Sequence, residues 1–146
     1  LVGFGSNADG QHTTRPEQKT MRRAMELALE DAGLAPSAIG YVNGHGTATD
    51  QGDIAETLAT SSLFGEHMPI SSQKSFLGHT LGACGLTELA LLFAGLQQGP
   101  LPALPYAAHA SLPFSTSSLT VAPQAIVMAN FFGFGGNNAS LLLRRC

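Results

Sequence analysis

The chain has 146 residues, of which 44% are hydrophobic and 12% are charged, and its formal net charge is −3. Seven Lys and Arg residues are too few to form the basic face that neutralises phosphates, which argues against a nucleic-acid partner. No run of about eighteen apolar residues occurs, so the sequence predicts no membrane span. The charged fraction is about half of the usual quarter, which favours a domain that is partly covered by a partner.

Two cysteines, Cys84 and Cys146, are too few for a disulfide framework, and we therefore expect a protein of the reducing cytoplasm. The first ten residues contain neither a start methionine nor a signal peptide, and they are typical of a strand already in progress. These features predict that the chain is the tail of a longer protein.

The first predicted helix covers residues 17–32, where apolar residues recur along one face. Thr14 and Glu17 have the spacing of a capping box at its start, and Gly33 follows its end. Further on, strands over 39–43 and 69–73 each run into a glycine-bracketed histidine segment. The other predicted elements are a helix that begins at Asp50 or Gly52 and ends at Phe64, a helix over 80–97, and strands over 119–121, 125–130 and 139–144.

This order of elements predicts one α/β domain over residues 1–146, with a mixed five-stranded sheet covered by helices. Prolines 100, 102, 105 and 113 mark a long irregular connection, and a glycine-rich turn over 132–138 joins the last two strands. His45 and His79 both follow the C-terminal end of a strand, where α/β sheets usually place their chemistry.

The two histidines are therefore the first candidates for a catalytic site. Two imidazoles can donate hydrogen bonds to one carbonyl oxygen, and Lys74, five residues before His79, would hold that site in the required charge state. Asp53 and Glu56 are either the polar face of a helix or the groups that lock the His45 loop or pair with Lys74.

Two other groups have alternative interpretations. Thr47 and Thr49 are either turn residues or hydroxyl groups that bind an extended polar substrate arm. Phe132 and Phe134, among the glycines at 133, 135 and 136, form either a hairpin tip or a mobile gate, because glycine permits large backbone movements. No pair of histidines or cysteines has the spacing of a metal site.

Three segments resemble one known family. They are HGTATDQGDIAE at 45–56, KSFLGHTLGACG at 74–85 and NFFGFGGNNAS at 130–140, and they are similar in order and spacing to the C-terminal half of the elongating β-ketoacyl-acyl carrier protein synthases. The resemblance implies a thiolase-like fold, of which this chain is the second half. It also implies fatty-acid or polyketide chain elongation, in which malonyl-acyl carrier protein loses CO₂ and condenses with an enzyme-bound acyl thioester.

The same resemblance implies roles for individual residues. His45 and His79 would stabilise the thioester oxygen as negative charge develops, and Lys74 would interact with Glu56. The other residues implied are Thr47 and Thr49 on the phosphopantetheine arm, Phe134 as the gating ring with Phe132 beside it, and Asp53, Gly133, Gly135 and Gly136 as supporting residues at the site. The expected partners are the acyl carrier protein, the missing N-terminal half with its nucleophilic cysteine, and a second copy of the complete synthase. No bound cofactor is expected.

The chain departs from the family pattern at three positions, where the family often has serine for Phe131, alanine for Cys84 and threonine for Asn137. Cys84 is not expected to be the nucleophile, because its neighbours are apolar and helix-forming and do not activate a thiol. A thiolase-type acyltransferase is one alternative, but the chain lacks the C-terminal cysteine motif of thiolases. Another alternative is a non-catalytic partner subunit similar to a chain-length factor. The intact set of His45, Lys74 and His79 argues against it.

Overall fold

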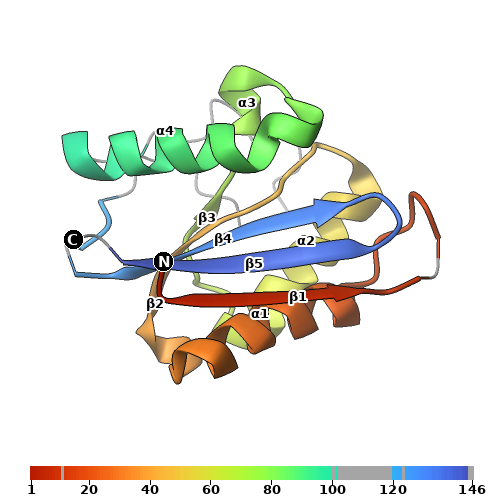
Figure 1. Cartoon of the computed structure of the whole chain (residues 1–146), viewed down its shortest axis with the longest axis horizontal. Coiled ribbons are helices and arrows are strands. Elements are labelled where there is room, and N and C mark those ends of the chain that lie inside the picture. Colours follow the sequence, from red (N-terminus) through yellow and green to blue (C-terminus); the bar gives the residue numbers. More distant parts are fainter. Residues whose placement is uncertain (11, 100, 102–119, 123, 145–146) are drawn as a thin grey trace.

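The computed structural model describes residues 1–10, 12–99, 101, 120–122 and 124–144. A five-stranded sheet forms its centre, in the order β1-β5-β4-β2-β3. Strand β2 runs parallel to β3 and β4, whereas β5 is antiparallel to both β4 and β1, so the sheet is mixed as predicted. Helices α1 and α2 lie on one face of the sheet and α3 and α4 on the other (Figure 1). The bounds of the strands and helices are β1 Gly3–Ala8, α1 Gln18–Ala32, β2 Ile39–Asn43, α2 Asp50–Phe64, β3 Ile70–Ser71, α3 Lys74–Leu77, α4 Cys84–Gln98, β4 Ile126–Gly133 and β5 Asn137–Arg144.

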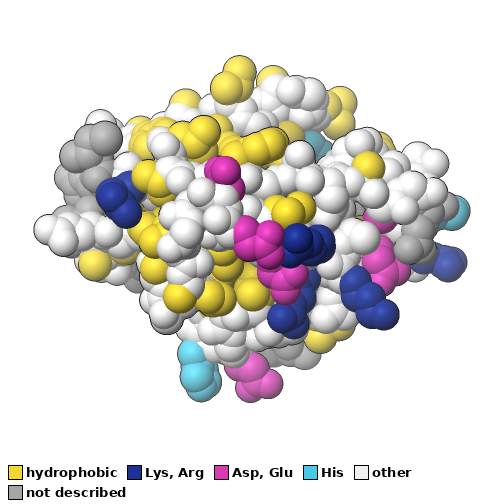
Figure 2. Space-filling view, turned by 60° about the horizontal axis from the view of Figure 1, so that its bottom comes forward, with side chains coloured by type: hydrophobic (Ala, Val, Ile, Leu, Met, Phe, Trp, Pro, Cys, Tyr) yellow, Lys and Arg dark blue, Asp and Glu magenta, His cyan; other side chains and the backbone are white. Residues whose placement is uncertain are grey.

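Two apolar clusters hold the layers together. The first packs α1 and α2 against the sheet through Met21, Met25, Val42, Ala59 and Met128. The second packs α4 against the opposite face and is formed by Tyr41, Leu92, Leu101, Val127, Ala129 and Leu143. The outer face of α1 is polar, with Arg and Lys side chains beside acidic ones (Figure 2), and it includes an ion pair of 2.8 Å between Arg22 and Glu26.

The start of α1 differs from the predicted capping box. The N-cap residue is Glu17, and no side chain caps the helix there. Thr14 lies outside the helix, where its N–H group donates to Nδ1 of His12 over 3.2 Å. The box fails because Thr14 belongs to this local turn and the helix begins later. Gly33 ends the helix in the left-handed conformation, as predicted.

Three other elements differ from prediction. The strand expected over 69–73 is reduced to Ile70–Ser71, and the segment after it forms the short helix α3 Lys74–Leu77. The helix expected from residue 80 begins as a 3-10 turn, Leu81–Ala83, before α4. Residues 120 and 121 are not in a strand, and residue 119 lies outside the described residues, as do the four prolines of the predicted connection.

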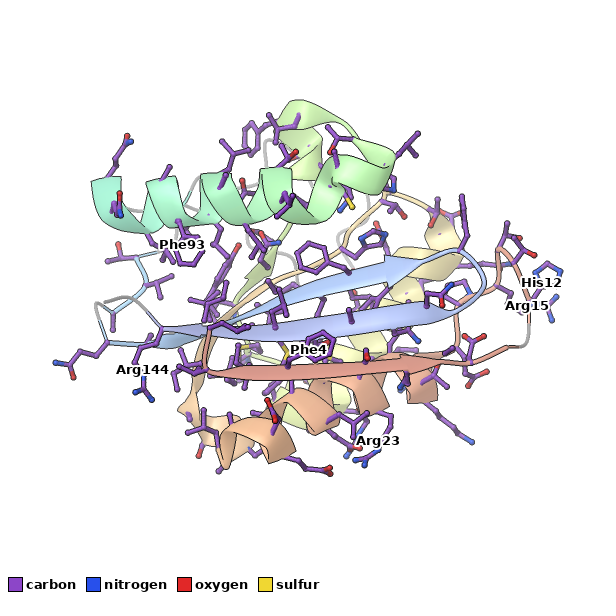
Figure 3. All side chains as sticks on the ribbon, viewed as in Figure 1. Phe4, His12, Arg15, Arg23, Phe93 and Arg144 are labelled. Carbon is purple, nitrogen blue, oxygen red and sulfur yellow. The ribbon has the colours of Figure 1, made fainter. Side chains whose placement is uncertain are left out.

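Figure 3 shows which labelled side chains lie at each end of the sheet. His12 and Arg15 lie at the end where β4 runs into the glycine-rich turn, whereas Arg144 and Phe93 lie toward the other end. The loop between β1 and α1 contacts that turn, since the Asp9 N–H group donates to the carbonyl of Gly136 and the Gly135 N–H group donates to the carbonyl of Thr13. Backbone hydrogen bonds therefore join the two loops that border the site.

Candidate functional site

The loop after β2 is held by a carboxylate from α2. The backbone N–H groups of His45 and Gly46 donate to the two carboxylate oxygens of Glu56 over 2.7 and 2.9 Å. Glu56 is only 2% exposed, so these hydrogen bonds are shielded from water. Of the alternatives for Glu56, locking of the His45 loop is therefore confirmed.

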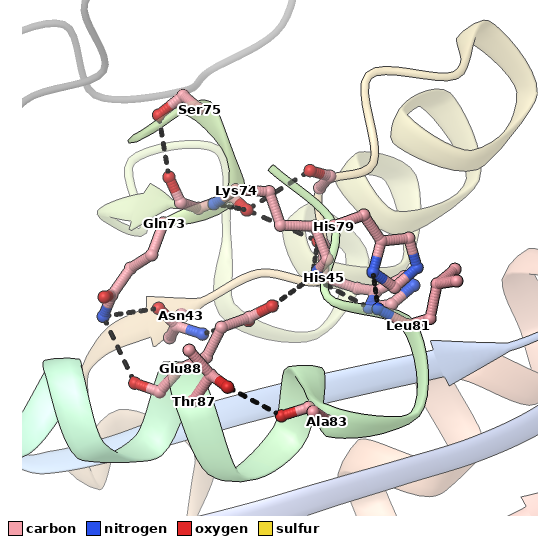
Figure 4. A network of polar contacts seen from close by, with 12 residues as sticks. Asn43, His45, Gln73, Lys74, Ser75, His79, Leu81, Ala83, Thr87 and Glu88 are labelled. Atoms are coloured by element: carbon pink, nitrogen blue, oxygen red, sulfur yellow. Dashed lines mark hydrogen bonds and ion pairs between the residues drawn. The ribbon is translucent and has the colours of Figure 1, made fainter. Parts of the chain in front are cut away.

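Lys74 reaches the same loop from the start of α3. Its Nζ atom donates to the carbonyl oxygen of His45 over 2.6 Å and lies 3.2 Å from Nδ1 of the imidazole (Figure 4). The expected pairing of Lys74 with Glu56 is wrong, because its ion-pair partner is Glu88 on α4, at 2.5 Å. The carboxylate of Glu56 instead accepts hydrogen bonds from the two backbone N–H groups, and the ammonium group of Lys74 pairs with a different carboxylate.

Glu88 was missed as a site residue in the sequence, where it only interrupts an apolar helix. It is 2% exposed, and its second oxygen accepts a hydrogen bond of 3.3 Å from the side-chain amide of Asn43 at the end of β2. A carboxylate on the apolar face of a helix is rarely buried without a partner, and this signal could have identified it.

His79 lies opposite His45, although the two come from different strand ends. Their ring centroids are 5.4 Å apart and the ring planes are nearly perpendicular, at 87°. The backbone N–H group of Leu81 donates to Nδ1 of His79 over 3.2 Å, so a proton on this ring lies on Nε2. Leu81 adopts a positive φ of 51°, which is unusual for a residue other than glycine.

The surroundings of His45 keep its imidazole neutral. Burial, followed by the nearby charges of Lys74 and His79, lowers its pKa from 6.5 to about 3. Because the Lys74 ammonium group lies beside Nδ1 and can only donate, the proton of neutral His45 is on Nε2. Both histidines therefore have Nδ1 engaged as an acceptor and Nε2–H available as a donor.

Two acidic groups near the loop have raised pKa values. Burial raises the pKa of Glu56 to about 7, although the N–H groups of Gly46 and His45 act in the opposite direction. Burial also raises the pKa of Asp53, which lies in the first turn of α2, and this effect exceeds that of the N–H groups of Ala48 and Thr47. Within the described residues, Asp53 forms no ion pair with Lys74, so that alternative is not observed.

A cavity of about 920 Å³ opens beside the two histidines. Two of the predicted site residues, Lys74 and Gly135, do not line the cavity. Lys74 instead contacts the backbone of the His45 loop. Phe132 is buried, and its ring centroid is 6.3 Å from that of His45, whereas Phe134 is 75% exposed at the turn. The predicted site residues that line the cavity are His45, Thr47, Thr49, Asp53, Glu56, His79, Phe132, Gly133, Phe134 and Gly136.

Cys84, the first residue of α4, also lines this cavity and is half-buried. Among the residues that the structure describes, no group of three His, Cys, Asp or Glu side chains is arranged to hold a metal ion. No helix within the same residues is long and apolar enough to cross a membrane.

Residues 1–106 match the family model of the β-ketoacyl synthase C-terminal domain. The chain belongs to this family, and its fold is the thiolase-like fold expected from the sequence motifs. It is 37% identical to 3-oxoacyl-[acyl-carrier-protein] synthase 2 of Staphylococcus aureus (strain COL), over 99% of this chain and 37% of that protein.

Solved structures give the same result. A β-ketoacyl synthase from Burkholderia phymatum STM815 is 49% identical, with a TM-score of 0.90, over 99% of this chain and 37% of the other. A chain of the complex between the ketosynthase ApeO and its chain length factor ApeC, from Xenorhabdus doucetiae, is 38% identical, with a TM-score of 0.90, over 100% of this chain and 39% of the other. The chain thus spans less than two fifths of the length of these relatives.

Proposed function

We propose that this chain supplies the His/His/Lys half of the active site of a 3-oxoacyl-[acyl-carrier-protein] synthase. The reaction is a decarboxylating Claisen condensation, in which malonyl-acyl carrier protein elongates an enzyme-bound acyl thioester. One observation carries the proposal: the rings of His45 and His79 are 5.4 Å apart, and each has Nδ1 engaged and Nε2–H free to donate.

In this proposal, the two Nε2–H groups donate to the thioester carbonyl oxygen of the malonyl group. When the bond to the carboxylate breaks, CO₂ leaves and its bonding electron pair forms the enolate, whose negative charge develops on that oxygen. The enolate carbon then attacks the acyl thioester and the cysteine thiolate leaves. Donors that are already oriented toward the developing charge stabilise the transition state more than the ground state.

Lys74, Glu56 and Glu88 act on this site as positioning residues. Glu56 fixes the backbone of the His45 loop, and Lys74 holds the carbonyl and Nδ1 of the same residue. Glu88 neutralises Lys74 within the buried part of the site. Removal of any of them is therefore expected to misplace or re-protonate the His45 imidazole without removing it.

The polar arm of the carrier would enter past Thr47 and Thr49. Their hydroxyl groups lie 3.0 Å apart at the start of α2, and both line the cavity. A phosphopantetheine arm carries amide groups that such hydroxyls can bind. The solved structures with this fold include a type II polyketide acyl-carrier protein in complex with its ketosynthase, which supports a carrier as the partner.

The nucleophilic cysteine and the rest of the fold would come from the N-terminal part of a longer synthase. The apolar side chains on α3 and α4 are unusually exposed, with Phe76 at 52% and Leu86 at 79%. Contiguous exposed apolar surface marks an interaction site, and the relatives are more than twice as long as this chain. We propose that the N-terminal part covers this surface, and that the complete synthase is a cytoplasmic homodimer.

The test is the His79→Ala variant of the complete synthase. Release of CO₂ from malonyl-acyl carrier protein should fall by about 10²–10³ fold, while acylation of the cysteine by acyl-carrier protein continues. His67→Ala, in the exposed loop after α2 and outside the cavity, is the control and should change neither rate. Decarboxylation at the wild-type rate in His79→Ala would reject the proposed function.

A further inference from the structure

The cavity extends around the end of β4, because two successive phenylalanines line it from opposite faces of the sheet. Side chains alternate between faces along a strand, so Phe131 and Phe132 point in opposite directions. Phe132 belongs to the apolar cluster under α1 and α2, whereas Phe131 packs against the cluster under α4. Both line the cavity, which therefore has one lobe on each face.

The two lobes differ in chemistry. The lobe on the α2 side is bordered by four polar residues, Thr47, Thr49, Asp53 and Glu56, besides the apolar Met21 and Phe132. The lobe on the α4 side is bordered chiefly by apolar or small residues, and the two histidines lie where the lobes meet. The residues on the α4 side are His79, Leu81, Gly82, Cys84, Phe131, Gly133, Asn137 and Ala139, the last three placed on this face by their pairing in the β4–β5 ladder.

Phe131 forms the inner wall of the α4-side lobe. Its ring lies against the first turn of α4, where a Cβ atom on Gly85 would be 3.9 Å from the ring. Behind the ring is the buried cluster that includes Leu92, Val127 and Ala129. The half-buried ring therefore separates the cavity from the apolar core, and its size fixes how far the lobe extends.

We propose that Phe131 determines the length of the acyl chain that this site accepts. The inference rests on the proposed function, because it assumes that the acyl thioester on the cysteine of the N-terminal part lies beside the two histidines, where the enolate attacks it. With the polar carrier arm on the α2 side, the hydrocarbon of the acyl group enters the apolar lobe and meets the Phe131 ring. Members of the family often have serine at this position, and the smaller side chain would leave the lobe open toward Leu92.

The test compares Phe131→Ser, Phe131→Leu and wild type in the complete synthase, with saturated acyl thioesters of increasing length as primers and malonyl-acyl carrier protein as extender. The readout is kcat/KM as a function of primer length. Wild type should show a length limit, beyond which Phe131→Ser should gain about tenfold or more relative to short primers, with Phe131→Leu between them. Phe4→Ala removes a ring from β1 outside the cavity and should keep the wild-type profile.

An unchanged length profile in Phe131→Ser and Phe131→Leu would overturn the inference. Loss of activity toward all primers in both variants would also overturn it, since the ring would then support the site rather than select the substrate. The proposed function fails in a different way: wild type would then not release CO₂ from malonyl-acyl carrier protein with any primer.

Discussion

Lys74 and Glu88 form a buried ion pair, with 2.5 Å between Nζ and Oε1 and with side chains that are 5% and 3% exposed. Two charges removed from water are stabilised only where further hydrogen bonds satisfy them. Lys74 also contacts the His45 carbonyl and imidazole, and Glu88 also accepts from Asn43. The position of the His45 loop is thereby coupled to α4, which lies on the opposite face of the sheet from α2.

Replacing Lys74 with methionine should destabilise the protein by about 3–5 kcal/mol, because Glu88 would remain as a buried charge without its partner. The expected result is measured as the free energy of unfolding in urea. The double variant Lys74→Met with Glu88→Leu should recover most of this loss without recovering condensation, since no ammonium group then holds the carbonyl and Nδ1 of His45. If the double variant were no more stable than Lys74→Met, the buried charge would not be the cause.

Glu56 should make the stability of the protein depend on pH. Burial raises its pKa from 4.5 to about 7, so the folded protein retains a proton that the unfolded chain has already lost. The contribution of Glu56 is therefore fully present below about pH 4.5 and is lost as the pH rises toward about 7.

Glu56→Gln cannot titrate, and this part of the pH dependence should be absent in the variant. The difference in unfolding free energy, wild type minus variant, should fall as the pH rises between those two values. Chemical denaturation of both proteins at a series of pH values measures it, and the titration of His45 largely cancels in the comparison. A difference that does not change with pH would contradict the raised pKa.

A side chain at Gly136 should displace the Asp9 carboxylate. The φ of Gly136 is 72°, and a Cβ atom would lie within about 2 Å of the Asp9 carboxylate. Gly136→Ala should therefore cost clearly more than Gly10→Ala, where φ is similarly 65° but no atom lies within 4 Å. The Gly10 change should cost about 1–2 kcal/mol for the left-handed backbone alone. Equal melting temperatures for the two variants would show that the contact with Asp9 is relaxed in solution.

Phe134 should matter for substrate exchange and little for stability. Its ring is 75% exposed at the turn between β4 and β5, so Phe134→Ala should change the unfolding free energy by less than about 0.5 kcal/mol. If the ring gates the cavity, the variant should exchange acyl groups with the carrier at a different rate in the complete synthase. An unchanged exchange rate would show that Phe134 is only a hairpin residue.

Local sequence patterns determined much of the fold. Apolar periodicity placed α1 and α2 within about two residues of their observed bounds. The glycine-rich segment at 132–138 correctly predicted a turn between the last two strands, although β4 and β5 extend into this segment and leave residues 134–136 for the turn. Placing His45 and His79 after successive strand ends predicted that they would meet, because parallel strands end at one edge of a sheet. These features depend on local patterns of residues along the chain, so the sequence alone is enough to predict them.

Only the tertiary structure decided which charged groups pair. Sequence spacing allowed Lys74 to pair with Glu56, but the carboxylate of Glu56 is bound by two backbone N–H groups, and Glu88 approaches Lys74 from a helix that follows 10 residues later in the chain. The lobe beside Phe131 also depends on α4 packing over β4. Such contacts join different elements, and the free energy of burying a charge depends on the complete set of its neighbours in three dimensions.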